Sequence, residues 1–404
     1  MVRLGDHVDA CLGKMLDAKK NKGTPQPYLG NSNVRWGQFD LTDLAEMRFE
    51  PHEDVRYSLL PGDLVVCEGG EPGRCAIWNG PAGMKIQKAL HRIRPKSSLN
   101  NYYLFYWFQH AARAELLEPY FTGTTIKHLT GKAIAALEVP LPPIGTQRAM
   151  VDVLWRLDDR ITLLRETNAT LEAIAQALFK SWFVDFDPVR AKAEGRQPKG
   201  MDATTAALFP NTFEESELGL VPMGWEIGQL QDLLVLQRGF DLPAAERTEG
   251  GYPLIAASGP SGTHHIAMAK GPGVVTGRSG VLGKVFLTLE DYWPLNTTLW
   301  VKEFKRATPC YAFELLRLLD FASFNAGSAV PTLNRNHVHS LRYVLPPIEL
   351  VKAYEGTALS IHQRVLENNR QAQTLTQLRD TLLPRLISGQ LRLPDDDALL
   401  ESAC

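Results

Sequence analysis

The sequence has few cysteines and no long apolar run. Its 404 residues include only 5 cysteines. They are scattered, without a Cys-x-x-Cys pair, at Cys11, Cys67, Cys75, Cys310 and Cys404. This usage favours reduced thiols over a disulfide framework. No apolar stretch reaches membrane-spanning length, and the first residues contain no signal-peptide core. We therefore expect a cytoplasmic protein with no membrane partner.

A charge excess of either sign is also missing. The formal net charge is −2, so the total charge gives no sign of a polyanionic partner. This is only weak evidence against nucleic-acid binding, because a local basic face can be hidden in a neutral total.

The common catalytic motifs are absent as well. Residues 277–284 contain glycines and a lysine, but Val285 stands where a phosphate-binding loop needs Ser or Thr. There is no G-x-S-x-G and no H-E-x-x-H. His264 and His265 are adjacent, so on a regular backbone their rings should diverge. Asp158 and Asp159 are expected on a solvated helix face. We expect no catalytic residue, bound cofactor or metal on this chain.

What the sequence does contain is an internal duplication. The motif Leu-Pro-Pro-Ile occurs at 141–144 and again at 345–348, which is 204 residues later, and an apolar-periodic stretch follows each copy. At the same offset Gly123 matches Gly327 and Leu137 matches Leu341. The two halves should therefore share one architecture.

Both periodic stretches carry a heptad stripe, which is typical of helices that pack along their length. The stripes consist of Leu154, Leu157, Ile161, Leu164, Asn168, Leu171 and Leu178, and of Ile361, Val365, Asn368, Leu375 and Leu382. The second falters near Leu378 and Arg379. Two such stripes can bury each other, and the amides of Asn168 and Asn368 would then fix the register at some cost in stability.

The proline pairs predict where these helices begin. We expect starts near Thr146 and Leu350, a first helix over residues 147–184, and a second that kinks or ends near Leu383 because Pro384 lacks a backbone donor. The second helix would then be shorter than the first.

Shorter patterns repeat in the two remaining regions. A strand, glycine turn and strand are expected around residues 64–78 and 274–287, and amphipathic helices at 101–117 and 309–319. Residues 21–27 are expected to form a loop. The predicted division is a domain at 1–140, a helical spacer at 141–185, a linker at 186–220, a domain at 221–344, a helical spacer at 345–392 and a disordered tail at 393–404.

This pattern predicts an α+β protein in which two α/β domains are separated by two long antiparallel coiled-coil helices, with a pseudo-two-fold duplication. Two equivalent domains on a fixed spacer suit a split target, and DNA offers equivalent major-groove faces about every 34 Å. The alternatives are a self-contained DNA-modifying enzyme, for which a cofactor motif is missing, and a tandem scaffold or binding module for a non-nucleic ligand.

Base reading needs Arg or Lys for guanine and Asn or Gln for adenine on exposed loops. The candidates in the first domain are Lys19, Lys20, Lys22, Asn31, Asn33, Arg35, Gln87 and Lys88. The candidates in the second are Ser258, His264, His265, Arg278, Ser279 and Asn296. Arg278 is preferred because the neighbouring glycines allow a close approach of the backbone.

The sequence combines the duplicated Leu-Pro-Pro-Ile with its long helix, the turn at 277–284, the segment at 62–74 and the helix exit at 179–188. These features give the whole chain a resemblance to the specificity subunit of type I restriction-modification systems. It implies two target recognition domains, each reading half of a bipartite, asymmetric sequence in double-stranded DNA, with the helices setting the unread gap.

The resemblance also implies partners. These are two methyltransferase subunits, which bind S-adenosylmethionine and methylate adenine, and two restriction subunits, which use ATP and magnesium. This chain would then be the DNA reader and not the enzyme. Partners that close around the duplex would supply phosphate contacts, which would explain a near-neutral reader.

Overall fold

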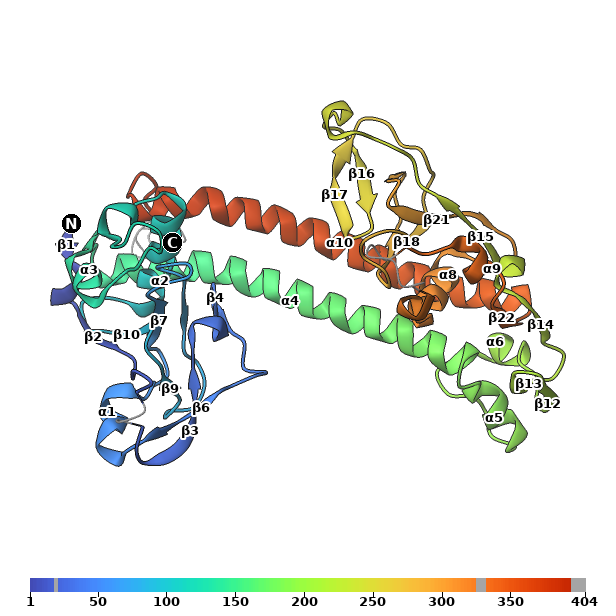
Figure 1. Cartoon of the computed structure of the whole chain (residues 1–404), viewed down its shortest axis with the longest axis horizontal. Coiled ribbons are helices and arrows are strands. Elements are labelled where there is room, and N and C mark those ends of the chain that lie inside the picture. Colours follow the sequence, from blue (N-terminus) through green and yellow to red (C-terminus); the bar gives the residue numbers. More distant parts are fainter. Residues whose placement is uncertain (18–20, 325–331, 394–404) are drawn as a thin grey trace, which may run out of the picture. The chain divides into compact units, whose positions relative to one another are not determined.

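The computed structural model describes residues 1–17, 21–324 and 332–393. The chain divides into two units, one made of Met1–Leu163 with Gln371–Cys404 and the other of Leu164–Arg370 (Figure 1). Lys19, Lys20, Gly327 and residues 394–404 of the predicted tail lie outside the described residues.

The first unit contains a four-stranded antiparallel sheet and a second, three-stranded sheet. The main sheet has the order β2 (Val8–Leu12), β10 (Leu90–Pro95), β7 (Leu64–Cys67) and β8 (Cys75–Ile77). The second has the order β6 (Glu46–Phe49), β3 (Thr24–Leu29) and β9 (Lys85–Ile86). In it β3 is antiparallel to β6 and parallel to β9. The predicted strand pair around the first glycine turn is confirmed.

The prediction of a loop at residues 21–27 is partly wrong, because β3 begins at Thr24. Pro25 and Pro27 are tolerated there since β9 pairs only with Tyr28 and Leu29, so no strand lies along the other edge beside the prolines. Two small pairs complete the unit, β1 (Val2–Arg3) with β11 (Glu138–Val139) and β4 (Val34–Arg35) with β5 (Gln38–Phe39).

Two capped helices cover this unit, and the first of them confirms the amphipathic helix expected from residue 101. The Asn100 side chain accepts a hydrogen bond from the backbone N–H of Tyr103 and so caps α2 (Asn101–Arg113). Thr130 caps α3 (Gly131–Ala136) in the same way. The buried aromatic side chains of α2 form the core of the unit together with apolar residues of both long helices.

The second unit repeats this topology. Its main sheet has the order β15 (Leu234–Arg238), β21 (Thr298–Phe304), β18 (Gly273–Gly277) and β19 (Val285–Thr288). Its second sheet has the order β17 (Gly259–His264), β16 (Tyr252–Ala256) and β20 (Trp293–Pro294). Again the middle strand is antiparallel to one neighbour and parallel to the other. The duplication predicted from the sequence is therefore confirmed as a repeated topology.

The remaining elements of the second unit surround these sheets. They are α7 (Leu230–Leu233), α8 (Pro309–Leu318), α9 (Arg335–His339), and the pair β14 (Glu226–Gln229) and β22 (Arg342–Leu345). Helix α8 confirms the amphipathic helix expected near Pro309.

Residues 186–220, for which the sequence predicts a linker, form a folded connection. They contain α5 (Asp187–Ala193), α6 (Ala203–Ala207) and β12 (Phe213–Ser216), which pairs with β13 (Gly219–Pro222). Phe186, Val189 and Phe209 are buried in the core of the second unit, which explains why this glycine- and proline-containing segment is ordered.

The two long helices are α4 (Ile144–Phe183) and α10 (Ile348–Ile387), with 40 residues each. They begin directly after the proline pairs, because the carbonyls of Pro143 and Pro347 already accept helical hydrogen bonds. The prediction of a shorter second helix is wrong, since α10 continues through Pro384. Leu383, Leu386 and Ile387 are buried in the core of the first unit, and this packing outweighs the lost hydrogen bond in the last turn.

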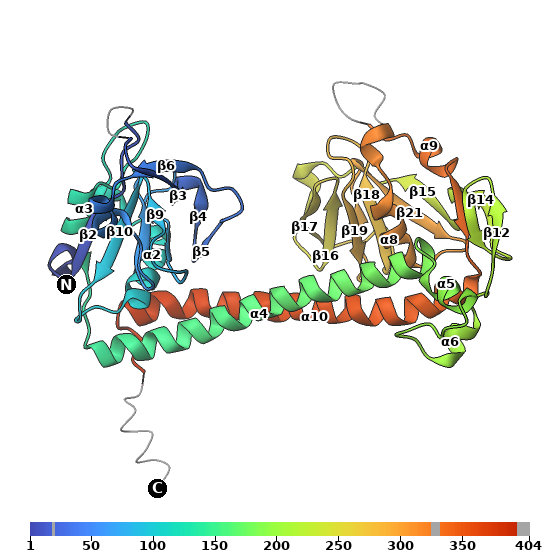
Figure 2. The ribbon, with the colours of Figure 1, turned by 90° about the horizontal axis from the view of Figure 1, so that it is seen from below.

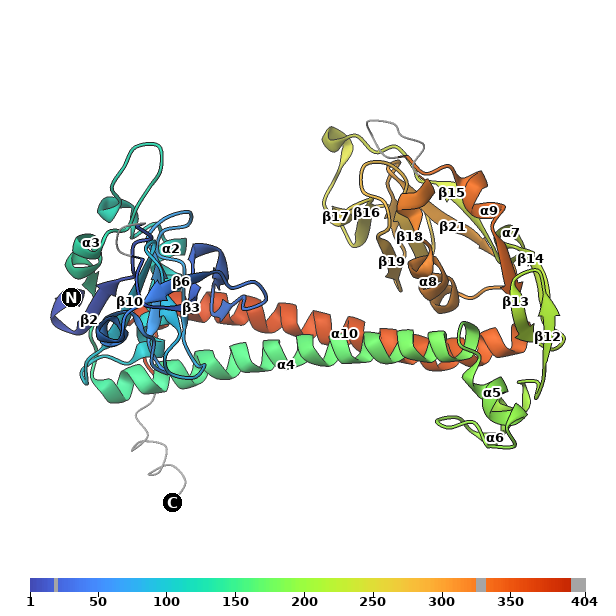
Figure 3. The same cartoon turned by 60° about the horizontal axis from the view of Figure 1, so that its bottom comes forward.

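Within each unit, a segment of α4 lies beside a segment of α10 in the opposite chain direction (Figures 2 and 3). Leu154 shares the first unit's core with Leu383, and Asn168 contacts Asn368 in the second unit. The buried stripe residues are Leu154, Ile161, Leu164, Asn168, Val365 and Asn368. Those only half-buried are Leu157, Leu171, Leu178, Ile361, Leu375 and Leu382. Together with the two α/β domains, the antiparallel helices confirm the predicted fold class.

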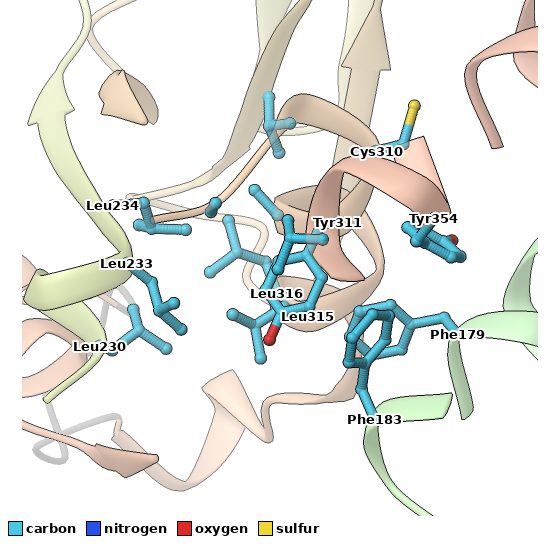
Figure 4. Packing of buried hydrophobic residues seen from close by; sticks show 14 of the residues in the cluster. Phe179, Phe183, Leu230, Leu233, Leu234, Cys310, Tyr311, Leu315, Leu316 and Tyr354 are labelled. Carbon is cyan, nitrogen blue, oxygen red and sulfur yellow. The ribbon is translucent and has the colours of Figure 1, made fainter. Parts of the chain in front are cut away.

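Aromatic side chains fill the core of the second unit where α4 ends. Phe179 and Phe183 of α4 point toward Tyr311 of α8 and Tyr354 of α10 (Figure 4). The ring centroids of Phe183 and Tyr311 are 4.9 Å apart, and those of Phe179 and Tyr354 are 5.6 Å apart. Edge contacts of this kind stabilise a core beyond the area they bury. Within the described ranges, no helix is both long and apolar enough to cross a membrane.

Candidate nucleic-acid interface

The candidate base-contacting residues in the first unit differ in the exposure and hydrogen bonding of their side chains. Lys22, Arg35 and Lys88 are exposed, whereas Asn33 is 8% exposed. The Asn33 amide accepts a hydrogen bond from the backbone N–H of Gly30 and donates to the carbonyls of Asp40 and Asp43. Asn33 therefore holds its own loop together and has no donor left for a base.

Three further candidates in this unit are partly engaged. Asn31 donates its amide to the carbonyl of Gly69 at 3.0 Å. The guanidinium of Arg35 donates to the carbonyls of Ser32 and Val34. Gln87 is half-buried, and its backbone forms a bridge with Lys14. Of the three, only Arg35 presents an exposed charged group.

In the second unit, Ser258 and His265 are exposed, whereas His264 is 3% exposed. The two adjacent histidine rings do not diverge as expected, since their centroids are 4.4 Å apart. The reason is that β17 ends at His264, so strand alternation no longer separates the side chains. The Nδ1 atom of His264 is within hydrogen-bond distance of the backbone of Thr248, and its ring lies 5.2 Å from that of Trp293.

The preferred candidate, Arg278, sits in a turn that is closed on itself. Its backbone N–H donates to the carbonyl of Thr297, and its guanidinium donates to the carbonyl of Asn296 at 3.2 Å. Ser279 forms a backbone bridge with Thr332. A Cβ on Gly277 would lie 1.8 Å from the carbonyl oxygen of Val281. The glycine is therefore required by the turn itself, and its presence does not indicate a ligand.

Asn296 is held by an acidic side chain. Its amide donates to Asp241, which also forms an ion pair with Arg238 at 3.1 Å. The structure thus brings Arg278, Ser279 and Asn296 together at one end of the main sheet. Ser258 instead lies in the turn between β16 and β17, and the two histidines lie at the end of β17.

Three basic side chains that the sequence gave no reason to single out are buried in the first unit. Lys14, Lys85 and Arg92 are 3%, 2% and 3% exposed. Lys14 pairs with Glu53 at 2.6 Å, Lys85 with Asp54 at 2.5 Å and Arg92 with Asp9 at 2.8 Å. Because the three residues are far apart in the sequence, only the fold shows that they converge on one segment.

The described cysteines are not placed to act as nucleophiles. Burial raises the pKa of Cys67 to about 11 and that of Cys75 well above its usual value. Burial likewise raises the pKa of Cys11 and Cys310. These thiols are protonated near neutral pH and are poor nucleophiles. Over residues 1–17, 21–324 and 332–393, no group of three or more His, Cys, Asp or Glu is placed to hold a metal ion.

The long helices carry two polar clusters where they face each other. In the second unit, Asn368 donates its amide to the side-chain oxygen of Asn168 at 2.8 Å, and Asn168 donates to Asn369 at 2.9 Å. This agrees with the predicted role of the two amides in the register.

The other cluster, in the first unit, corrects the expectation that Asp158 is simply solvated. Asp158 accepts hydrogen bonds from the Tyr106 hydroxyl at 2.8 Å and from Arg379 at 2.6 Å. Asp159 is exposed, as expected. Arg379 stands where the heptad stripe falters, so an ion pair replaces the apolar contact there.

Comparisons with known proteins point in one direction. Residues 2–173 match the family described as the type I restriction modification DNA specificity domain. The MjaIX specificity subunit of Methanocaldococcus jannaschii is 21% identical over 361 residues, covering 83% of this chain and 78% of that protein. The HindI specificity subunit of Haemophilus influenzae is 27% identical over 338 residues, covering 66% and 72%.

A solved structure agrees in fold. The crystal structure of a type I restriction-modification S subunit from M. genitalium superposes with a TM-score of 0.63. It is 15% identical to this chain and covers 98% of it, while 96% of that structure is matched.

Proposed function

Because this chain belongs to the family of type I restriction-modification specificity subunits, we propose that it reads a bipartite, asymmetric sequence in double-stranded DNA, one half with each recognition domain. Specificity subunits are the non-catalytic DNA-recognition components of these systems. The chain therefore selects the target, and other subunits carry out the chemistry.

The observation that carries the proposal is the repeated topology. Each unit has the same main sheet, the same mixed second sheet and its own segment of both long helices. Two copies of one reading domain suit two separate blocks of sequence. The helices then set the number of base pairs that are not read.

We further propose that the long helices bind two methyltransferase subunits and that two restriction subunits complete the complex. In this proposal S-adenosylmethionine, ATP and magnesium are held by these partners. The net charge of −2 fits a reader whose partners supply much of the phosphate contact. Exposed apolar residues on α4 such as Trp155 and Ile174, which are 44% and 50% exposed, offer contact area to such a partner.

The direct base contacts stay predictions, and the exposure and hydrogen bonding of each side chain rank the candidates. Lys22, Arg35, Lys88, Ser258 and His265 have exposed side chains, so they are the stronger candidates. Asn33 and His264 are buried and bonded within the domain, so they are weaker. Arg278 is half-buried and its guanidinium donates to one carbonyl, so it ranks between these two groups.

Sequencing of methylated bases tests the proposal. DNA from a host that carries the chain with its methyltransferase partner is compared with DNA from the same host lacking the chain. We expect a split adenine-methylation motif that disappears on deletion. An unchanged methylation pattern would contradict the proposal and favour a scaffold for a non-nucleic ligand. Methylation by the purified chain alone would instead indicate a self-contained enzyme.

A further inference from the structure

A short segment of the first unit is held in place by buried basic side chains. It follows β6 and consists of a 3-10 helix at Pro51–Glu53 and α1 (Asp54–Tyr57). Lys14 donates to the Glu53 carboxylate and to the carbonyl of Arg48, while Lys85 donates to Asp54 and to the Ser58 hydroxyl. Each cation also lies near the buried ring of Phe49, with Nζ 5.0 and 5.6 Å from its centroid.

Arg92 holds the same segment by its backbone. Its guanidinium donates to the carbonyls of Val55 and Arg56, both at 3.1 Å, and pairs with Asp9 at 2.8 Å. Burying a cation costs free energy unless its partners are well placed. Three buried cations therefore hold this segment, Lys14 and Lys85 through its carboxylates and Arg92 through two of its backbone carbonyls.

What this rigid segment presents to solvent is an aliphatic side chain. Val55 is 86% exposed, which is the highest value among the exposed large apolar residues of the described chain. Arg56 beside it is exposed, stacks on Tyr57 at 5.4 Å, and forms no ion pair with a carboxylate in the described part of the chain. The nearby carboxylates of Glu53, Asp54 and Asp9 are each neutralised by a buried cation. Arg56 is the exposed cation beside Val55 on this segment.

A single exposed aliphatic residue is ordinary on a protein surface. The second unit, however, repeats the feature at the equivalent place in the topology. Residues 265–272 follow β17 as residues 50–58 follow β6, and the bridge between Ala269 and Tyr292 corresponds to that between Ser58 and Lys85. Ile266 is 48% exposed there, and Lys270 is exposed.

The second unit fixes its segment by different means. The backbone of Ala269 forms two hydrogen bonds with that of the fully buried Tyr292, at 2.9 and 3.0 Å. The backbone N–H of Gly271 donates to the carboxylate of Asp291 at 3.0 Å. Both units thus present an aliphatic side chain and a cation on a held segment, although the residues that hold it differ.

These features fit the major groove of DNA. An aliphatic side chain can contact the C5-methyl group of thymine, and a neighbouring cation favours the negative duplex. A segment held in place before binding loses little conformational entropy when it docks.

We propose that residues 50–58 and 265–272 are base-reading segments, one in each recognition domain, that place Val55 and Ile266 against thymine methyl groups. The proposal rests on the proposed function of the chain as a DNA reader. It adds a specific pair of contacts to that function, at equivalent places in the two domains. Neither Val55 nor Ile266 is a polar residue of the kind a search for hydrogen-bonding side chains finds.

The test uses the full chain with its methyltransferase partner in a host whose methylated adenines are sequenced. The variants are Val55→Ser and Ile266→Ser, with Leu116→Ser and Leu220→Ser as controls, whose side chains are 48% and 59% exposed. We expect Val55→Ser to reduce the preference for thymine at one position of one half-site by roughly tenfold. Ile266→Ser should do the same in the other half-site, and the controls should leave the motif unchanged.

Three results would overturn the inference while the proposed function stands. One is a motif unchanged by both variants, and another is a change of both variants in the same half-site. The third is an equal loss of methylation at all targets together with loss of co-purifying methyltransferase, which would make the segments a partner surface. If the wild-type chain directs no split motif at all, the proposed function itself fails. All four substituted residues are exposed, so the urea midpoints should match that of the wild type.

Discussion

At the scale of single residues, His362 is a buried histidine, and one of its ring nitrogens forms no hydrogen bond with a described residue. It is 7% exposed, lies 5.5 Å from the ring of Phe313 between centroids, and has no hydrogen-bond partner for Nε2 among the described residues. Burial, assisted by the charge of Arg317, lowers the pKa of His362 from 6.5 to about 4.

The direction of the pH effect follows from this shift. Between pH 6.5 and about 4 the unfolded chain binds a proton at this histidine and the folded chain does not. The free energy of unfolding should therefore fall as the pH falls through this window, by up to about 3 kcal/mol. His362→Phe should flatten the dependence in urea unfolding measured from pH 7 to 4. His265→Ala, at an exposed histidine, is the control and should leave the curve unchanged.

Asn168 and Asn368 make a second prediction at this scale. Asn368 is 2% exposed and donates its amide to Asn168, so Asn168→Leu leaves a buried donor without an acceptor. This should lower the free energy of unfolding by about 1–3 kcal/mol. The double variant Asn168→Leu with Asn368→Leu should recover most of the loss, because both polar groups are gone.

A double-mutant cycle in urea measures the coupling between the two amides. Additive losses would contradict a direct interaction. Under the proposed function, the double variant should also methylate targets with more than one gap length, since the amides no longer select one register.

Among the polar residues, the sequence predicted the position of some side chains but not the hydrogen bonds of others. The heptad pattern placed Asn168 and Asn368 between helices, since periodicity alone identifies a helix face. It could not show that the amide of Asn33 is consumed by its own loop, or that Lys14, Lys85 and Arg92 meet under one segment. Those contacts join residues that are far apart in the chain, and no local pattern records them.

At the scale of elements, the first unit joins its recognition domain to the helices by charge. Asp158 of α4 binds both Tyr106 of α2 and Arg379 of α10, and Asp380 pairs with Arg379 and with Arg113 of α2, each at 2.7 Å. Burial and the charge of Asp158 raise the pKa of Tyr106 far above its usual value, so the hydroxyl stays a donor. Three helices are therefore held by one network.

Removing the central carboxylate should loosen this junction. Asp158→Ala leaves the Tyr106 hydroxyl and the Arg379 guanidinium without this acceptor, so the free energy of unfolding should fall by about 1–3 kcal/mol. The estimate is kept low because the Asp158 side chain is 25% exposed. Asp159→Ala is the matched control on the adjacent, exposed residue and should change it by less than about 0.5 kcal/mol. Equal effects of the two variants in urea unfolding would refute the role of the network.

The same scale shows why the element boundaries were only partly predictable. The proline pairs located both helix starts to within a few residues, because proline fixes the local backbone. The prediction of a helix end before Pro384 was wrong, because the helix beyond it is stabilised by the burial of Leu386 and Ile387 in the core of the first unit. A local rule fails where tertiary packing contributes more than the hydrogen bond it removes.

At the scale of the whole chain, the two halves share a topology but not a chemistry. Asp158 and His362 are related by the 204-residue offset, so one helix position holds an ion-pair network in one unit and a neutral imidazole in the other. Selection on a duplicated chain can keep the backbone while each domain changes its side chains. This divergence is also why the duplication in the sequence predicts the fold but not the bases that each domain would read under the proposed function.

The final prediction concerns the antiparallel helix segments as a ruler. Asn168 donates to the backbone carbonyl of Val365, so residues near 171 in α4 lie opposite residues near 364 in α10. Inserting one heptad after Leu171 and another after Arg364 keeps both stripes and the asparagine contact. It lengthens the paired segment by ~10.5 Å at ~1.5 Å per residue.

Under the proposed function, this double insertion should lengthen the unread gap of the methylation motif by about three base pairs, since the rise is ~3.4 Å per base pair. Both half-sites should stay the same, because neither recognition domain is altered. Insertion into α4 alone places the helix stripes beyond the insertion against the wrong partners, so it should give weak methylation. Sequencing of methylated adenines distinguishes these outcomes. A double-insertion variant that methylates efficiently at the original spacing would show that the helices do not set the gap.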